Sequence, residues 1–496
     1  MAVTRYRAYG SVLEALSKGL YPDKKHVIRE FVQNAYDALY DLRTKFPNKS
    51  FQPIHVKIAH PSIFIADTGI GMNESKMLQY QNLGYSEKEK TKHAGFRGIG
   101  KYSGLAVANK IIVDSSPIGV PEKYRVVIDV EGMIGALEKE RNPPLEELLE
   151  RFTSFDRAHD EESSHYTFVE LHGVRKDAAI LFDIEEMKRY LARNAPVPLN
   201  PEFPYEKTIT EQLTENVPEY FACPLELNGD PLYKPFFKDC RAPGFELIFF
   251  DDKDDKQAEL LAFCWYSENK HKGQFDPRQD AGLVYRVKNI AVGNGLLSRE
   301  ALWETTGERA FYFFGEIHVL DKEVIPSSDR TDFEDNAARR RLYDRCKRIA
   351  TVLSKRAGEQ SQIRRFDEII KKGNEYVSER AEEIRKGDVP VEVKETVVFD
   401  LQTIEVDINR RMRSSKSETA KKKARQLLTK ARKVMASAKD ENKLFDIRRE
   451  IKLTGASRSV YETIIEVLKK ELSGEPLRLE RIVKAIHRAL RESASA

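Results

Sequence analysis

Three oxygen-bearing side chains recur at helical spacing near the start of the chain. Glu30, Asn34 and Asp37 stand at positions i, i+4 and i+7 of a largely apolar segment, so a helix would present them on one face. The amide oxygen of Asn34 suits Mg²⁺, because this hard cation prefers oxygen ligands and keeps several waters. One turn earlier, the carboxylate of Glu30 can orient and deprotonate a water. The alternative is an amphipathic helix with a solvated polar face.

A second motif places a carboxylate at the end of an apolar strand. Asp67 directly follows the run SIFIA and begins the sequence DTGIGM, which contains Gly69 and Gly71. A carboxylate in this position can accept a hydrogen bond from an exocyclic amine such as the one adenine presents. The two glycines allow backbone to approach a flat base closely. The alternative is an ordinary D-x-G turn.

A third motif is the glycine-rich loop from Gly95 to Gly100, which precedes a predicted helix starting near Lys101. Exposed backbone N–H groups and a helix N-terminus together form a phosphate cradle. The loop does not follow a strand of a βαβ unit and does not end in G-K-[ST], which disfavours a dinucleotide fold and a P-loop. Taken alone, such a pattern is more often a plain loop.

In this order, the three motifs strongly resemble those of the GHKL ATPases, named for gyrase, ninety-kilodalton heat-shock chaperones, histidine kinases and MutL. The resemblance implies ATP and Mg²⁺ as ligands, Glu30 as catalytic base and Asn34 as metal ligand. It also implies that Asp67 binds adenine, that the glycine loop closes over the phosphates, and that Thr167 shares a water with Asp67. Relatives often carry glycine where this chain has Tyr166. The implied nucleotide-binding residues are Asn34, Asp37, Asp67, Gly69, Gly71, Met72, Asn82, Gly95, Phe96, Arg97, Gly98, Ile99, Gly100, Lys101 and Thr167.

Phosphoryl transfer also needs positive charge at the developing oxygens, and a second domain can supply it. The stretch GEIHVLDKEVIPSSDRTDFED resembles the transducer domain of MORC and heat-shock-type ATPases, in which a basic residue reaches the γ-phosphate. This chain has Arg330 where MORC proteins usually have lysine, and arginine is permanently charged and bidentate. Lys288 is the second catalytic candidate. The alternative for Arg330 is a surface arginine paired with Asp329 or Asp332.

The elements that must position these residues follow from hydrophobic periodicity. A helix is predicted from about 12 to 43, followed by the strands HVKIA, SIFIAD, IIVDSS, YRVVIDV and YTFVELHGV. This order suggests helices on one face of a mostly antiparallel sheet. Prolines near 195–205 mark a boundary, after which FELIFFDD, AELLAFCWYSE, AGLVYRVKNIAVG and AFYFFGEIHVL predict a second sheet. A helix near Asn336 closes that domain.

The region after Gln360 reads as long charged helices with one predicted strand, VEVKETVVFDL. We therefore predict an α+β protein of three domains. Residues 1–195 form a GHKL (Bergerat) α/β sandwich, 205–355 an S5-like transducer domain, and 360–496 a helical region for dimerisation or partner binding.

Bulk composition narrows the class of protein. The chain has 496 residues, a net charge of +4 and four scattered cysteines. A chain of this length is too long to form a single hydrophobic core. The cysteine spacing disfavours a zinc site or a disulfide framework. No apolar stretch is long enough to cross a bilayer, and no signal-peptide core precedes the first motif. We expect a cytoplasmic protein without membrane contact.

The predicted function is that of an ATP-hydrolysing, nucleotide-driven dimeric clamp, MORC-like or MutL-like, acting on DNA or a protein complex. The basic segment 410–439 is either a solvated helix of a dimerising bundle or a phosphate-binding stripe for duplex DNA. Two alternatives stay open: a heat-shock-type chaperone acting on protein clients, and a nucleotide-dependent scaffold with negligible turnover. A sensor histidine kinase is disfavoured, because the ATP motifs begin almost at residue 1.

Overall fold

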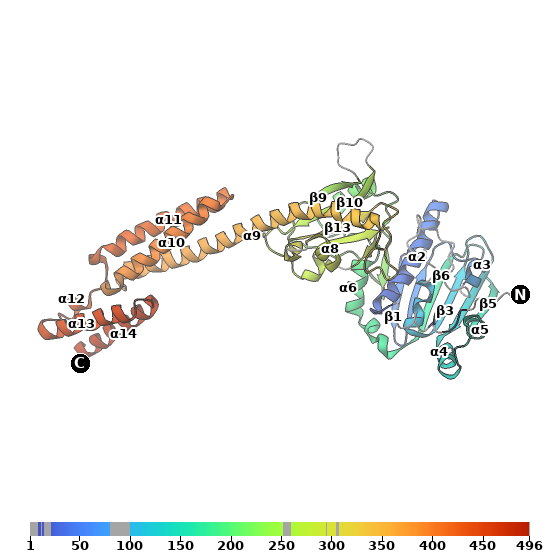
Figure 1. Ribbon diagram of the computed structural model, residues 1–496, viewed down its shortest axis with the longest axis horizontal. Coiled ribbons are helices and arrows are strands. Elements are labelled where there is room, and N and C mark those ends of the chain that lie inside the picture. Colours follow the sequence, from blue (N-terminus) through green and yellow to red (C-terminus); the bar gives the residue numbers. More distant parts are fainter. Residues whose placement is uncertain are drawn as a thin grey trace. The chain divides into compact units, whose positions relative to one another are not determined.

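The computed structural model describes residues 8–10, 12–13, 21–79, 100–250, 259–293, 295–303 and 307–495. The chain divides into two compact units, Met1–Lys355 and Arg356–Ala496. The first unit holds two β-sheets with their helices, and the second is helical (Figure 1). The predicted α+β class, with two sheet regions followed by helices, is confirmed.

The first sheet has eight strands in the order β5-β4-β3-β6-β2-β1-β7-β8. Neighbouring strands are antiparallel except for β1 and β7, which are parallel. The sheet takes in β7 and β8 from beyond the proline-rich stretch, and the domain boundaries at 195 and 205 stay a prediction. The strands are β1 (Ile54–Ala59), β2 (Ser62–Asp67), β3 (Ala108–Ser116), β4 (Glu122–Asp129), β5 (Thr153–His159), β6 (Tyr166–Val174), β7 (Leu225–Leu227) and β8 (Asp230–Pro231).

Helix α2 (Lys25–Lys45) packs on the first sheet through a continuous apolar stripe. Its residues Val27, Ile28, Phe31 and Leu39 are buried at the spacing of one helix face. The carboxylate of Asp23 accepts a hydrogen bond from the Lys25 N–H at 3.0 Å, as expected of a residue that precedes a helix. The other helical segments of this part are α3 (Glu74–Leu78), η2 (Gly100–Ala106), α4 (Val130–Lys139), α5 (Leu145–Phe152), η3 (Lys176–Phe182) and α6 (Ile184–Asn194). The helix predicted near Lys101 is thus the short 3₁₀ helix η2.

The second sheet has the strand order β12-β11-β13-β10-β9. Only β11 and β13 pair in parallel. The predicted strand AGLVYRVKNIAVG is two strands joined by Lys288 and Asn289, whose φ angles are +51° and +60°; positive φ at both residues is the turn that suits a tight hairpin. The strands are β9 (Gly244–Phe249), β10 (Leu260–Glu268), β11 (Gly282–Val287), β12 (Ile290–Val292) and β13 (Phe313–Val319). The accompanying helical segments are α7 (Glu206–Asn216), η4 (Arg278–Asp280), α8 (Gly295–Leu302) and η5 (Gly307–Tyr312).

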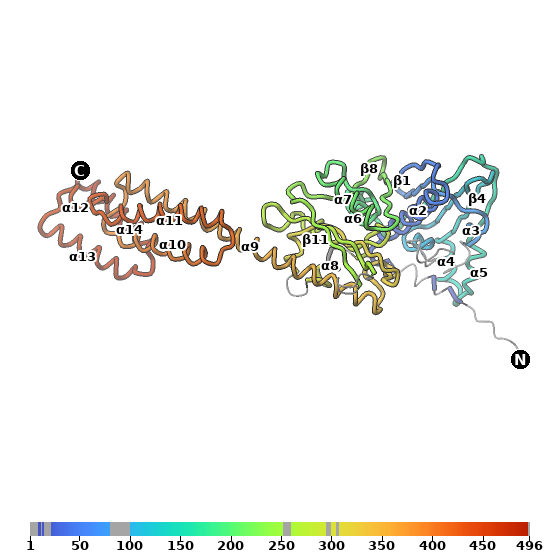
Figure 2. The backbone as a smooth tube through the Cα atoms, turned by 90° about the horizontal axis from the view of Figure 1, so that it is seen from above, coloured from blue at the N-terminus to red at the C-terminus, as the bar shows by residue number. Residues whose placement is uncertain are grey.

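The second unit contains the C-terminal part of the long helix α9 (Ala337–Lys386) and the shorter helices that follow it. Helices α10 (Lys394–Ser414) and α11 (Glu418–Lys439) lie side by side (Figures 1 and 2). Gly373 of α9 allows close packing, since a Cβ there would lie 2.9 Å from a methyl group of Leu427. The remaining segments are η6 (Val391–Val393), η7 (Glu441–Lys443), α12 (Ile447–Glu450), α13 (Gly455–Glu471) and α14 (Pro476–Ser495).

The predicted strand VEVKETVVFDL is wrong. These residues form η6 and the first two turns of α10. Val393, Val397 and Leu401 are all buried and lie four residues apart, which is the period of a helix face. Burial of this face overrides the preference of the β-branched valines for strands.

Within the described residues, no helix combines the length and the apolar character needed to cross a membrane. All four cysteines are buried free thiols.

Candidate active site

Helix α2 places the first motif beside the end of the glycine loop. Glu30 and Asp37 are buried, and Asn34 is half-buried. A Cβ at Gly100 would lie 2.9 Å from a carboxylate oxygen of Glu30, so the backbone of Gly100 lies directly against that carboxylate. The last residue of the glycine loop and the predicted base are therefore neighbours.

The segment that follows Asp67 is held between α2 and the end of β3. The Asp67 carboxylate accepts a hydrogen bond from the N–H of Gly69 at 2.8 Å. A Cβ at Gly69 would lie 2.5 Å from the Cβ of Ala38 on α2. Gly71 has a φ of +66°, and a Cβ there would overlap the carbonyl oxygen of Ser116. Glycine is thus required at both positions for backbone to pack against α2 and β3.

Asp67 lies at one end of a polar row that crosses three strands. Asp67 pairs with Thr167 across β2 and β6, and Thr167 pairs with Ser115 across β6 and β3. The hydroxyl oxygens of Ser115 and Thr167 are 3.0 Å apart. Ser115 also accepts a hydrogen bond from the N–H of Met72 at 2.9 Å. Ser115 thus joins Met72 to Thr167, and Thr167 is the strand partner of Asp67.

Sequence reasoning missed Ser115. The available signal was the polar pair Ser115-Ser116 at the end of the apolar run IIVD. Ser115 is fully buried, and a buried hydroxyl needs hydrogen-bonding partners. The strand register supplies them, and the register is not visible in the sequence.

The loop that carries Arg330 is anchored next to α2. Arg330 is buried, with 5% of its surface exposed, and has a φ of +56°. Its carbonyl oxygen accepts a hydrogen bond from the N–H of Gly293 at 2.7 Å. Asp332, one partner considered for it, forms an ion pair with Arg339 at 2.7 Å. Arg330 is therefore not a surface residue, and its pairing with Asp329 or Asp332 stays a prediction.

Arg29 joins the Arg330 loop to the predicted base. Its Nη2 donates to the carbonyl oxygen of Asp329 at 2.8 Å and lies 3.3 Å from a carboxylate oxygen of Glu30. Arg29 is buried, so both interactions lie largely out of water. The sequence signal was a single arginine within the apolar flank of the first motif, and we did not single it out.

Lys288 brings a second cation toward α2. Burial lowers the pKa of Lys288 to about 8, while the nearby Asp37 and Glu219 carboxylates oppose this shift and Arg330 adds to it. The Lys288 ammonium makes no hydrogen bond within the described part of the chain. A partly desolvated ammonium without a hydrogen-bond acceptor suits an anionic ligand.

Only the end of the glycine loop can be described. Gly100 begins η2, and the Lys101 ammonium donates to the carbonyl oxygen of Gln79 at 2.6 Å. Burial lowers the pKa of Lys101 to about 8. The predicted site residues Asn82, Gly95, Phe96, Arg97, Gly98 and Ile99 lie outside the described residues.

The oxygen atoms on α2 fit a cation held mainly by a ligand. Among the described residues, no group of three or more His, Cys, Asp or Glu side chains is arranged to hold a metal ion. Mg²⁺ in nucleotide sites usually takes one or two protein oxygens together with phosphates and water. The half-buried amide of Asn34, one turn from Glu30, agrees with that chemistry.

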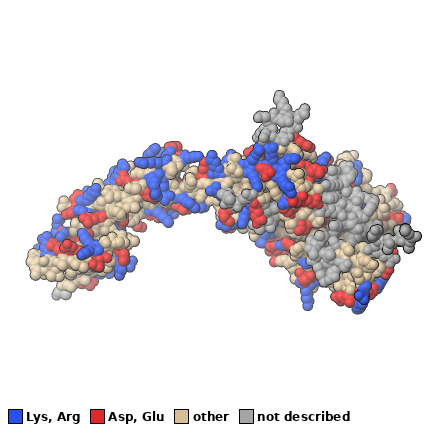
Figure 3. Space-filling model, viewed as in Figure 1, with Lys and Arg blue, Asp and Glu red and all other residues tan. Residues whose placement is uncertain are grey.

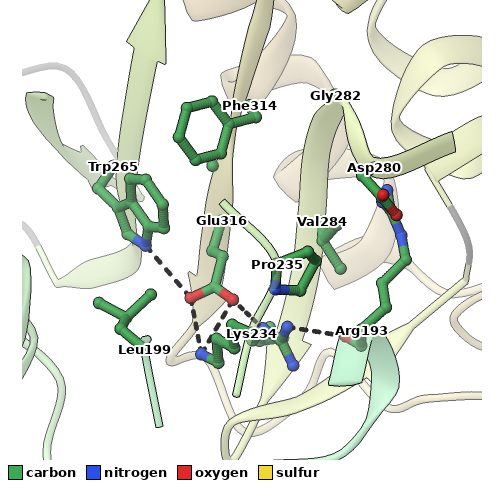
Figure 4. A pocket seen from close by; sticks show the side chains of 12 residues that line it. Arg193, Leu199, Lys234, Pro235, Trp265, Asp280, Gly282, Val284, Phe314 and Glu316 are labelled. Carbon is green, nitrogen blue, oxygen red and sulfur yellow. Dashed lines mark hydrogen bonds and ion pairs between the residues drawn. The ribbon is translucent and has the colours of Figure 1, made fainter. Parts of the chain in front are cut away.

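A buried charged cluster supports the second sheet (Figure 4). Glu316 accepts from Lys234 at 2.9 Å and from Trp265 at 3.2 Å, and it also pairs with Arg286. Arg286 and Lys234 hold the pKa of Glu316 well below its usual value despite burial. The adjoining cavity is small, about 30 Å³.

The same cluster holds the segment that connects the two sheets. Arg286 donates to the carbonyl oxygen of Arg193 at 2.8 Å. Asn289 donates to the carbonyl oxygens of Pro196 and Phe221 at 3.2 and 3.1 Å. These contacts give the cluster a structural role, which is to fix the connector and the turn that carries Lys288.

The N-terminal part of the chain is similar to a known protein family. Residues 23–157 match the model of the "Histidine kinase-, DNA gyrase B-, and HSP90-like ATPase" family. Chaperone protein HtpG of Wolinella succinogenes is 30% identical over 145 residues, covering 24% of this chain and 23% of the relative. HtpG of Borreliella afzelii is 32% identical over 124 residues, covering 21% and 20%. HtpG of Helicobacter hepaticus is 29% identical over 143 residues, covering 24% and 23%.

The chain spans less than a quarter of the length of these relatives. The resemblance to GHKL ATPases is confirmed for the N-terminal part, which contains an ATPase domain of this superfamily. The match includes Glu30, Asn34, Asp37 and Asp67, whereas Thr167, Lys288 and Arg330 lie beyond it.

Proposed function

We propose that this chain binds and hydrolyses ATP and uses the reaction to switch between conformations. The observation that carries the proposal is the meeting of three segments at α2. Gly100 lies against Glu30, the Asp67–Gly71 segment packs on Ala38, and the Arg330 loop is bonded to Arg29. These segments come from distant parts of the sequence, and two of them lie within the part that matches the ATPase family.

The residues gathered on and around α2 each have a role in this proposal. Glu30 orients and deprotonates the attacking water, and Asn34 provides an oxygen ligand for Mg²⁺. Asp67 accepts a hydrogen bond from the adenine amine, and Thr167 and Ser115 fix its surroundings through the hydroxyl contact between them. Held by Asn34 and the nucleotide, Mg²⁺ would neutralise negative charge on the phosphates.

Arg330 and Lys288 supply the positive charge in this proposal. The ammonium of Lys288 is buried without a hydrogen-bond acceptor among the described residues, and Arg330 lies on a loop bonded to α2 through Asp329. A preorganised cation in a partly buried site stabilises developing negative charge more strongly than one in water. The γ-phosphate would thus be bound by both sheets of the first unit, and its release would loosen their contact.

The output of the switch is the further part of the proposal. The HtpG relatives are chaperones by name, which favours a nucleotide-dependent homodimer that acts on protein clients over the MORC-like or MutL-like clamp. A clamp on DNA is the second candidate, favoured by the spacing around Arg330 and by the basic segment 410–439. A scaffold without turnover is disfavoured, because it has no need for Glu30.

An ATPase assay with a matched pair of variants tests the proposal. Glu30→Gln should bind Mg²⁺-ATP with near-normal affinity and lose at least about 99% of turnover, since a positioned base contributes about 10²–10⁴-fold. Glu131→Gln removes an exposed carboxylate of α4 and should leave turnover unchanged. Equal turnover in wild type and Glu30→Gln would refute the role of Glu30. Absence of any Mg²⁺-dependent ATP binding to the wild type would refute the proposed site as a whole.

The output is tested by adding an unfolded model protein or duplex DNA to the same assay. Faster turnover with the unfolded protein, together with less aggregation of it, supports the chaperone function. Faster turnover with duplex DNA that fades as salt rises favours the clamp instead.

A further inference from the structure

Helix α11 has one fully buried face and one basic face. Its apolar residues pack against α9 and α10 and expose little or none of their surface. They are Ala420, Ala424, Leu427, Leu428, Ala431, Val434, Met435 and Ala438. The cations lie on the exposed side, which Figure 3 shows along the upper edge of the C-terminal unit. We call five of them the basic face: Lys422, Arg425, Lys430, Lys433 and Lys439.

The basic face is left without compensating charge by the described part of the chain. No acidic residue occurs between Glu418 and Asp440. At the edges of α11, Lys421, Lys423 and Arg432 do pair, with Glu418, Asp367 and Glu405. No ion pair joins any member of the basic face to a described carboxylate, and all five are exposed.

Some cations elsewhere in the same unit are paired within their own helix. On α13 and α14, cations pair within the helix, as in Arg458 with Glu462 and Lys484 with Glu480, each at 2.9 Å. On α11, Lys422 and Arg425 are three residues apart, as are Lys430 and Lys433, and like charges at this spacing destabilise a helix. A helix that keeps repelling charges on its open face is suited to an external anion.

The charge of the two units points the same way. Residues 356–496 contain 33 Lys and Arg against 24 Asp and Glu, a net charge of +9. Residues 1–355 contain 50 against 55, a net charge of −5. The near-neutral total of the chain therefore hides a basic C-terminal unit, and such a unit attracts polyanions from a distance.

We propose that the basic face of α11 binds the phosphate backbone of a duplex nucleic acid. A membrane surface does not fit, because interfacial helices insert their apolar face into lipid and that face of α11 is already buried. Single strands do not fit, because α11 has no aromatic residue on which bases could stack. From Lys422 to Lys439 the helix rises about 25 Å, a length over which a duplex presents about 15 charges.

This binding is independent of the ATP site. It deepens the DNA-binding candidate of the proposed function by assigning the contact to one helix face, and neither Glu30 nor nucleotide takes part. Contacts to phosphates alone carry no sequence information, so affinity should depend on salt and length and little on sequence. Such sequence-independent binding of a duplex would bring the ATPase domain to nucleic acid.

The test compares two variants of the full chain that lose the same charge. The first is Lys422→Gln, Arg425→Gln, Lys430→Gln and Lys433→Gln together. The control is Lys452→Gln, Lys470→Gln, Arg481→Gln and Arg488→Gln together, four exposed cations elsewhere in the same unit. Fluorescence anisotropy without nucleotide measures binding to a 30-base-pair DNA duplex between 50 and 200 mM salt.

The wild type should lose affinity steeply as salt rises, with a slope of about 0.9 per phosphate contact. Loss of four contacts should reduce this slope by about 3.6. The fall in affinity between 50 and 200 mM salt should therefore be about 150-fold smaller in the first variant than in the wild type. The control should keep at least about half of the wild-type slope. Unchanged thermal unfolding of both variants would show that the helices remain intact.

Three results would overturn the proposal. They are no duplex binding by the wild type at 50 mM salt, equal losses in the two variants, and binding of single strands, polyglutamate or anionic vesicles as tight as that of the duplex. An A-form RNA duplex bound as well as DNA would support it, because the backbone chemistry is shared. A protein that binds duplex but lacks ATPase activity would refute only the proposed function, so the two failures are distinguishable.

Discussion

Replacing Arg29 tests whether the loop of the second sheet acts on the base through a single side chain. Arg29 is buried and contacts both the Glu30 carboxylate and the Asp329 carbonyl oxygen through Nη2. Arg29→Met keeps an unbranched apolar side chain and removes both interactions. The variant leaves Glu30 without this partner and the Arg330 loop without its bond to α2.

The expected size of the effect follows from these two contacts. Hydrogen bonds to charged groups contribute about 1.5–3 kcal/mol each, and breaking a buried ion pair costs about 3–5 kcal/mol. The part of the effect of Arg29 that passes through Arg330 cannot exceed the effect of losing Arg330 itself. Removing one preorganised donor slows catalysis by about 10²–10³-fold. We expect Arg29→Met to lower kcat by about 100-fold, and Arg29→Lys by about tenfold because the charge remains.

The assay is a double-mutant cycle on kcat with Arg29→Met, Arg330→Ala and the combination. A residue that acts through Arg330 gives a double variant no slower than the slower single variant, with a coupling energy of about 2–3 kcal/mol. ATP affinity should change little, since neither residue contacts adenine in our proposal. Independent, additive effects, with coupling below about 0.5 kcal/mol, would refute the reasoning.

A matched arginine separates positioning from general stability. Arg309 donates twice to Ser354, at 3.0 and 3.2 Å, away from α2. Arg309→Met should lower thermal stability and show no coupling to Arg330→Ala. Coupling as strong as that of Arg29 would mean that an arginine elsewhere in this unit gives the same result.

Three further predictions address the nucleotide pocket. Asp67→Asn should weaken ATP binding by at least about 100-fold, since its amide presents an N–H where the adenine amine needs an acceptor; calorimetry measures this. Gly71→Ala should abolish binding, because a Cβ at a φ of +66° overlaps the Ser116 carbonyl oxygen, whereas Gly119→Ala, with open space around it, should retain binding. The pKa of about 8 for Lys288 means that its charge is lost as pH rises through 8, so ATP affinity should fall between pH 7 and 9. Lys288→Arg should remove that fall; if only Lys101→Arg removes it, the titrating cation is Lys101, whose pKa is also about 8.

The fold class was predictable because its signals are local. Apolar periodicity identified α2 and the main strands of both sheets, and glycines and prolines marked the turns. Strand β5 was missed because its sequence, TSFDRAH, has no apolar run and it lies at the sheet edge. The start of α10 was misread because its valines favour strands, and only packing against neighbouring helices reveals the four-residue period.

The candidate site was predictable where its residues lie close in sequence. Glu30, Asn34 and Asp37 share one helix, and Asp67 begins one loop. Arg29 and Ser115 were missed because their partners are distant: Asp329 is 300 residues from Arg29, and Thr167 is 52 residues from Ser115. No spacing pattern encodes such pairs, since strand register and the packing of two sheets create them.

The contacts of the second sheet also limit where a conformational switch can move. Lys288 and Asn289 are adjacent, yet Lys288 lies near Asp37 and Asn289 holds the connector at Pro196. Because Asn289 is bonded to a buried charged cluster through Lys234 at 2.7 Å, moving the turn alone would leave several buried polar groups without partners, which is costly. The connector and the turn should therefore move as one body with the second sheet. The contact that is easier to break is that of Arg29 with Asp329, because it is a single hydrogen bond to a loop. Hydrolysis should therefore break this contact first.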